Sequence, residues 1–318
     1  MVAANRVGMN TDSETVEAGI PVIACWEDIY RRGRYADDID STKTQLLDVI
    51  APYYGLQPPK PCGLTNCHTP HNNGYLIVTA DGRETNIGAD CGKKHFPEFA
   101  AQARRVNRIL REQRLRNIVI EAQARIPAVQ LEIADLRAGD YGAEWTVRCI
   151  FSLRLAVTAA GAQLWLDLKR RANVGDATVN KVRERSKAEI QELIAANLGR
   201  PDELRYESKP VGRISGLELL SNRLDLHTNL VRGAEKALDD IRAVDAKRTG
   251  GKTLQATSKL VGELDAHLVL VRETLAAGRL FFTDANLALL AYIAADAEKR
   301  KKLVGLTVNK LATSPSSR

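Results

Sequence analysis

The stretch that decides the fold is PCGLTNCHTPHNNGYLIVTADGRETNIGADCGKKHF, residues 61–96. It holds Cys62, Cys67 and Cys91, and His95 follows Cys91 by four positions. Two residues at this spacing lie on one face of a helix, so Cys91 and His95 can bind the same ion. Cys62 and Cys67 flank a four-residue loop that is short enough to bring their sulfurs together. We therefore predict that these four side chains bind one metal ion. Zn²⁺ fits a tetrahedral set of thiolate and imidazole ligands.

This ligand set has alternatives. His68 and His71 are close enough in sequence to replace Cys67, and His71 is the main substitute. Four protein ligands are typical of a structural zinc, whereas a catalytic zinc keeps one position open and needs a general base nearby. The competing interpretation is that the three cysteines are ordinary buried side chains or a redox pair. We expect structural Zn²⁺.

Short elements are expected between the two ligand pairs. Residues 74–79 (GYLIVT) and 83–88 (RETNIG) read as strands, and the link Ala80-Asp81-Gly82 is typical of a hairpin. Asp90 is suited to cap a helix that begins at Cys91. The predicted order is therefore a ligand pair, a hairpin, a second ligand pair and a helix.

This order resembles a treble-clef zinc finger over residues 62–96. The resemblance implies that Cys62 and Cys67 are the knuckle ligands and that Cys91 and His95 are the helix ligands. The chain departs from the family pattern because four residues, rather than two, separate the knuckle cysteines. The segment GADCGKKHF (88–96) also resembles uncharacterised bacteriophage or prophage proteins, which implies a phage origin and a bacterial host cytoplasm.

Composition sets the fold class and the compartment. The 318 residues are 44% hydrophobic but only 5% aromatic, a balance that favours helices over a β-sandwich. No apolar run is long enough to span a membrane, and Met1 to Glu14 lacks the features of a secretory signal. We expect a mainly α, cytoplasmic protein that does not bind a membrane.

Two regular patterns outside the cysteine region predict long helices. Apolar residues recur at helical spacing from Phe99 to Ile126, so a helix is expected until Pro127. Residues 217–241 and 254–275 each repeat apolar positions at alternating steps of three and four. A Gly-rich link joins them, which predicts an antiparallel, coiled-coil-like helical hairpin.

These patterns predict five segments along the chain. They are a small helical region (1–60), a zinc module with a long basic helix (61–127), a helical middle region (128–215), the hairpin with a final helix (216–311) and a disordered tail (312–318).

Positive charge is concentrated after the cysteines. From Lys93 to Arg125 there are nine basic and three acidic residues, while the net charge of the whole chain is +7. A basic row of this kind can follow phosphates, although many charge runs are only solvated helix faces. The residues predicted to bind nucleic acid are Lys93, Lys94, Arg104, Arg105, Arg108 and Arg111.

These features favour a zinc-binding regulatory or accessory protein that binds nucleic acid through the basic helix. The alternative is an adaptor or inhibitor that acts on a host or partner protein through its helical hairpin, with zinc purely structural. Apolar seams of this length also allow a homo-oligomer. No catalytic constellation and no strand-fed phosphate loop can be singled out, so an enzyme is not expected.

Overall fold

The computed structural model describes residues 19–294 and 297–313. The chain divides into two compact units, Met1–Arg114 and Leu115–Arg318, and the boundary falls inside helix α3 (Phe99–Ala138). The finer division into five segments stays a prediction. Two predictions fall outside the described residues. One is that Met1 to Glu14 lacks a secretory signal, and the other is the part of the predicted disordered tail at residues 314–318.

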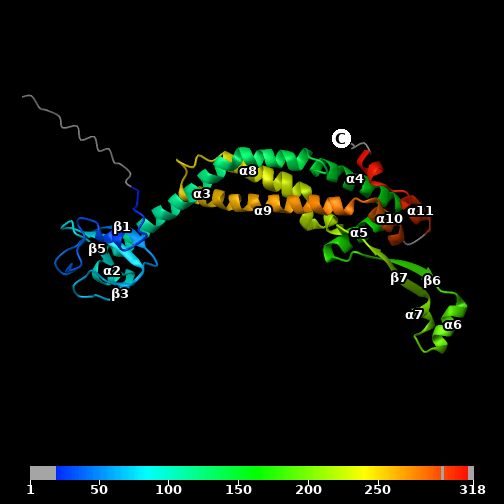
Figure 1. The fold of residues 1–318 in the computed structure, drawn as a ribbon, viewed down its shortest axis with the longest axis horizontal. Helices are drawn as coiled ribbons and strands as arrows, with labels where there is room; N and C mark the ends of the chain where they lie inside the picture. Colours follow the sequence, from blue (N-terminus) through cyan, green and yellow to red (C-terminus); the bar gives the residue numbers. More distant parts are fainter. Residues whose placement is uncertain (1–18, 295–296, 314–318) are drawn as a thin grey trace, which may run out of the picture. The chain divides into compact units, whose positions relative to one another are not determined.

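The first unit is built around small antiparallel sheets (Figure 1). A three-stranded sheet has the order β1-β4-β5, and a second sheet pairs β2 with β3. The elements are α1 (Glu27–Tyr30), β1 (Leu46–Tyr53), β2 (Lys60–Pro61), β3 (Pro70–His71), β4 (Gly74–Thr79), β5 (Glu84–Ile87), α2 (Ala89–His95) and the start of α3. The β4–β5 hairpin therefore matches the strands predicted from the sequence.

Strand β1 replaces the helix expected in the N-terminal region. Val49 and Ala51 are buried, and the strand pairs antiparallel with β4 from Leu46–Thr79 to Tyr53–Gly74. The apolar spacing through Leu46, Leu47 and Ile50 suggested a helix because a short apolar run has no distinctive period. Pairing with a neighbouring strand, which is a tertiary effect, decides the conformation.

The second unit is mostly helical. Its elements after α3 are α4 (Ala143–Ala160), α5 (Ala162–Val174), β6 (Thr178–Glu184), α6 (Lys187–Ala195), α7 (Pro201–Leu204), β7 (Tyr206–Arg213), the 3₁₀ turns η1 (Leu217–Leu220) and η2 (Asn222–Leu224), the π-helical η3 (His227–Glu235), α8 (Lys236–Arg242), α9 (Gly251–Phe281), α10 (Asp284–Ile293), α11 (Ala297–Leu303) and α12 (Val308–Thr313). Helix α12 includes Ala312 and Thr313, which were expected to lie in the tail.

The mainly α fold class and the long helical hairpin are confirmed. Segments η3 and α8 form one arm of the hairpin and α9 forms the other. The arm before α9 is not one continuous α-helix, because 3₁₀ turns and a π-helical segment precede α8. Part of α3 packs in the same core, and the buried side chains include Ile126, Val129, Ile133, Leu230, Leu238, Leu264 and Val271.

Helix α3 does not end at Pro127, as the sequence predicted, but continues to Ala138. Proline removes one backbone hydrogen bond and crowds the preceding turn, at a cost of about 3 kcal/mol. Ile126 and Val129, on either side of the proline, are buried in the core shared with α8 and α9. Burial of each such side chain contributes about 1.5–3 kcal/mol, so packing outweighs the proline penalty.

Strands β6 and β7 form an antiparallel ribbon in the middle region (128–215), where the sequence predicts helices followed by an irregular section with one short strand at most. The ribbon pairs Thr178 with Arg213 at one end and Glu184 with Tyr206 at the other. Helices α6 and α7 lie at its tip and contain no buried residue. Gly175 ends α5 in the left-handed conformation just before the ribbon.

Candidate metal centre

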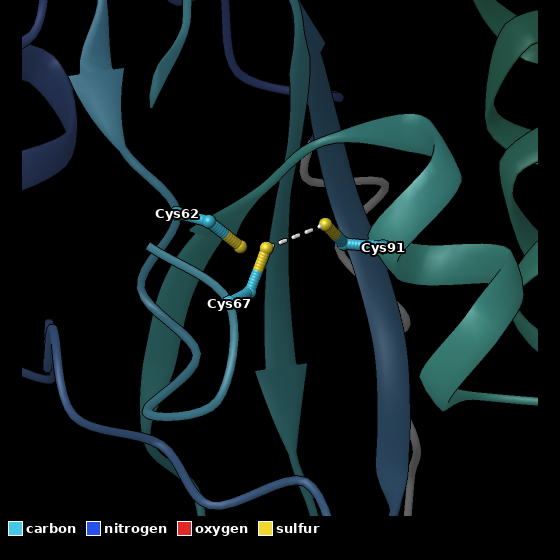
Figure 2. A group of neighbouring side chains, drawn as sticks. All are labelled: Cys62, Cys67 and Cys91. Carbon is cyan, nitrogen blue, oxygen red and sulfur yellow. Dashed lines mark hydrogen bonds between the residues drawn. The ribbon is translucent and has the colours of Figure 1, made fainter. Parts of the chain in front are cut away.

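Three cysteines from two separate segments meet in the first unit. Cys62 follows β2, Cys67 lies five residues further on, and Cys91 is in the first turn of α2. Their Sγ atoms all lie within 4.8 Å of one another, and those of Cys67 and Cys91 are 2.9 Å apart (Figure 2). The structure thus brings together three of the four side chains predicted as ligands.

Backbone hydrogen bonds hold the loop between Cys62 and Cys67 in a tight turn. The amide of Cys67 donates to the carbonyl of Leu64 (3.1 Å), and the amide of Cys62 donates to the carbonyl of Thr69 (3.1 Å). Leu64 is fully buried and anchors the loop in the core. This local geometry, rather than a disulfide, directs both sulfurs to the same side.

Gly63 fixes the loop against strand β5. A β-carbon at this position would overlap the hydroxyl of Thr85, and the Gly63 amide donates to the carbonyl of Asn86 (2.9 Å). Only glycine allows the loop backbone to come this close to the strand. The loop that carries Cys62 is therefore attached to the sheet that leads to Cys91.

Helix α2 begins two residues earlier than the sequence predicted. Gly88, not Asp90, is its N-cap, and Asp90 lies in the first turn. Gly92 is buried against the ring of Phe99, where a β-carbon would lie 2.6 Å from the ring. This contact brings α2 close to α3 and orients the helix that carries Cys91.

The three thiols influence one another's ionisation. Burial opposes ionisation of Cys67, but hydrogen bonds between Cys67 and each of Cys91 and Thr69 outweigh burial and lower the pKa of Cys67 to about 7. Burial and the hydrogen bond to Cys67 raise the pKa of Cys91 to about 12, and burial raises the pKa of Cys62. Near neutral pH the cluster therefore carries one thiolate, on Cys67, which the neighbouring thiol stabilises. Cys62 and Cys91 keep their protons until a bound cation replaces them.

The histidines lie outside the three-cysteine group. His95 is on the same helix as Cys91, and its Nδ1 lies 3.1 Å from the hydroxyl of Ser41. Nδ1 of His71 lies 3.1 Å from the hydroxyl of Tyr53, while its Nε2 is buried without a hydrogen-bond partner among the described residues. Burial lowers the pKa of His71 and favours its neutral form, which is the form that binds metals. His68 has a positive φ of 52° in the loop after Cys67.

Sequence reasoning did not identify Ser41 and Tyr53, the side chains that orient the two histidines. Both lie before the cysteine window: Tyr53 reaches it through the β1–β4 pairing, and Ser41 reaches it because Ile39 pairs with Leu64 in the cysteine loop. Tyr53 pairs with Gly74 in the β1–β4 ladder, where the absent side chain leaves room for its ring. Recognition of residues 46–53 as a strand ending opposite Gly74 would have been the signal for Tyr53.

The basic residues predicted to bind nucleic acid are all exposed. Lys93 pairs with Asp90 (3.3 Å), and Arg105 pairs with Asp48 (2.6 Å). Within residues 19–294 and 297–313, the other four form no hydrogen bond or ion pair, namely Lys94, Arg104, Arg108 and Arg111. Arg104, Arg108 and Arg111 lie at helical spacing on α3, so three uncompensated charges share one face.

Comparison with protein-family models, curated proteins and solved structures finds no match to this chain. In the part of the chain that the structure describes, no helix combines the length and the apolar character needed to cross a bilayer.

Proposed function

We propose that this protein holds a structural Zn²⁺ ion through Cys62, Cys67 and Cys91. Three sulfurs within 4.8 Å of one another are the observation that carries the proposal. Thiolates are preferred zinc ligands. A cation at the cluster would offset the negative charge that otherwise makes it unfavourable for these neighbouring thiols to ionise together. The order of loop, β4–β5 hairpin and helix α2 supports the treble-clef-like arrangement, in which the ion fastens the loop to the helix.

A histidine completes the tetrahedral set in this proposal. His95 is the first choice because it lies one turn after Cys91 on α2. Ser41, beside its Nδ1, would leave Nε2 for the metal. His71 is the alternative, and its buried, unpartnered Nε2 is the observation in its favour.

Metal analysis of the purified chain tests the site. We expect about one zinc per chain, loss of the ion in Cys91→Ser, and full occupancy in the control Cys25→Ser, because Cys25 is exposed and lies outside the cluster. Co²⁺ spectra of His95→Ala and His71→Ala identify the fourth ligand, because removing a ligand changes the coordination spectrum. Absence of metal from protein prepared without chelator would contradict the site.

We further propose that the protein is a non-enzymatic regulatory or accessory factor that binds nucleic acid through the exposed side chains of α2 and α3. The unpaired row of Arg104, Arg108 and Arg111 supports this proposal, because an arginine without an acidic partner can neutralise a phosphate and release its counterions. This row contains no aromatic side chain on which single-stranded bases could stack. We therefore favour contacts with the sugar-phosphate backbone of a duplex.

Binding of a labelled random-sequence duplex at several salt concentrations tests the second proposal. Replacing Arg104, Arg108 and Arg111 by Gln removes three phosphate contacts and reduces the slope of log K against log salt by about 2.7. The control replaces Arg232, Arg242 and Arg248 by Gln, which removes the same charge from the second unit and leaves binding unchanged. Equal losses in both triple variants would show that only net charge matters and would overturn the assignment to α3.

A further inference from the structure

An apolar groove lies beside helix α4 in the second unit. One cavity of about 520 Å³ is lined by α4 on one side and by Leu226 and η3 on the other. A second cavity of about 330 Å³ shares Val147, Phe151, Leu226 and His227 with the first, so the two lie next to each other. Such a size and such an apolar lining are typical of binding sites.

Helix α4 presents an apolar stripe, and two of its residues, Val147 and Phe151, line the groove. Val147 is 52% exposed and Leu155 is 56% exposed, and Phe151 lies between them at helical spacing. Side chains at positions i, i+4 and i+8 form one face of a helix, and an uncovered apolar face of this kind marks an interaction surface.

The opposite wall is π-helical. Segment η3 provides His227, Leu230 and Val231 to the groove, and Val231 is 39% exposed. A π-helical segment is rare and often occurs at functional sites. Two helical walls with apolar side chains between them form the kind of groove that receives a third helix.

The rim of the groove is more basic than acidic. Arg148 and Arg154 form no hydrogen bond or ion pair within the described ranges. Arg137 is paired with Glu235, and Lys169 lies near Asp225, whose carboxylate also accepts the amide of Thr228 (2.7 Å). The remaining charged side chain of the rim is Glu144, which forms no hydrogen bond or ion pair within the described ranges, and His227 also lines the groove.

We propose that this groove binds an amphipathic helix of a partner protein with acidic residues beside its apolar face. The apolar residues of the partner would cover Val147 and Phe151, and its carboxylates would pair with Arg148 and Arg154. Between Ala143 and Arg154, α4 rises about 17 Å, which matches about three turns of a bound helix. This surface involves neither the cysteines nor Arg104, Arg108 and Arg111, so it is independent of the functions proposed above.

A charge-swap experiment with model peptides tests the groove. The probe is a labelled Leu/Glu peptide of about 18 residues, long enough to be helical, with leucines on one face. Its Lys-for-Glu version and a scrambled version are compared by fluorescence anisotropy. We expect the full chain to bind the Leu/Glu peptide at least about tenfold more tightly than either comparison peptide.

The double variant Arg148→Glu with Arg154→Glu should reverse this preference. It should lose about tenfold in affinity for the Leu/Glu peptide and prefer the Leu/Lys peptide. Both substituted positions are exposed, so the fold should persist, which circular dichroism checks. The matched control Arg242→Glu with Arg248→Glu changes the same charge outside the groove and should bind like the unchanged chain.

Four results of the binding experiments would overturn the proposal. The first two are equal binding of the scrambled and the Leu/Glu peptides, and no reversal of preference in the Arg148→Glu, Arg154→Glu variant. The third is a loss of affinity of equal size in the Arg242→Glu, Arg248→Glu control. The fourth is that the groove binds the fatty acid laurate and neither peptide. Light scattering adds one further criterion. A dimer that the double variant dissociates would assign the groove to a second copy of this chain and would also overturn the proposal.

Discussion

Gly63 lies between Cys62 of the three-cysteine cluster and the buried Leu64, and the hydroxyl of Thr85 occupies the space of its missing side chain. Gly63→Ala should therefore push the loop away from β5 and lower the free energy of unfolding of the first unit by about 1–3 kcal/mol. Urea unfolding followed by Trp26 fluorescence measures the effect, since Trp26 is buried in this unit.

The control for this substitution is Gly33→Ala. No atom lies within 4 Å of a β-carbon at position 33, and its φ does not require glycine. We expect its stability to stay within about 0.5 kcal/mol of that of the unchanged chain. Equal effects at both positions would mean that the contact with Thr85 does not restrain the loop.

The ionisation of the cysteines predicts how zinc affinity depends on pH. Cys67, with a pKa of about 7, is half ionised at pH 7, whereas the raised pKa of Cys91, about 12, keeps that thiol protonated. Because Cys62 also has a raised pKa, zinc must displace between two and three protons at pH 7. Affinity should therefore rise by more than about a hundredfold per pH unit near pH 7.

Calorimetric titration in buffers with different ionisation enthalpies counts the released protons directly. Cys67→Ser should lower the count and weaken zinc binding, while Cys149→Ser should leave the count unchanged because Cys149 is buried elsewhere. Zinc binding without proton release would contradict the ionisation described here.

The approach of the cysteines to one another could be predicted where their spacing is local. Cys62 and Cys67 share one loop, so their approach follows from a few residues, and the helical period places Cys91 and His95 on one face. The surroundings of the histidines could not be predicted. The partner of His95 is Ser41, 54 positions earlier, and only the tertiary fold brings the two together.

At the level of elements, Pro127 interrupts the hydrogen bonding of α3 at an exposed position. Pro127→Ala should restore a backbone donor and raise the free energy of unfolding of the second unit by about 1–3 kcal/mol. Thermal unfolding followed by circular dichroism measures the gain. Pro201→Ala is the control, because Pro201 occupies the first turn of α7, where a proline removes no helical hydrogen bond.

A loss of stability in Pro127→Ala would mean that the proline ring supplies packing that its exposure does not suggest. No change would mean that the helix is already distorted there for another reason, contrary to the continuous α3 described above.

Elements with a long, consistent period were predictable, and elements fixed by pairing were not. The predicted apolar repeat from Leu254 to Leu275 lies within α9. Strands β1 and β6 were missed because each depends on a distant partner, β4 and β7. Local sequence carries little information about such pairing.

For the whole molecule, the division into two units predicts two separable responses to metal removal. Chelation should destabilise the unit that contains the cysteines and leave the helical unit folded, because each unit has its own buried core. Trp26 reports on the first unit, whereas Trp145 and Trp165 pack in the core of the second.

Two variants separate these signals in the full chain. In Trp145→Phe with Trp165→Phe, Trp26 fluorescence should change after chelator is added and recover with zinc. In Trp26→Phe, the remaining fluorescence should not respond. A response in both variants would show that the two units unfold together and would contradict their independence.

The ribbon of β6 and β7 has a further consequence for the way the chain can be cut. Its two strands pair over their whole length, while α6 and α7 at the tip bury nothing. The covalent link near Asn197 is therefore not needed to hold the strands in register. Fragments ending and starting at that tip should reassemble when expressed together, so the tip is a natural place for a split protein, a circular permutation or an inserted reporter domain.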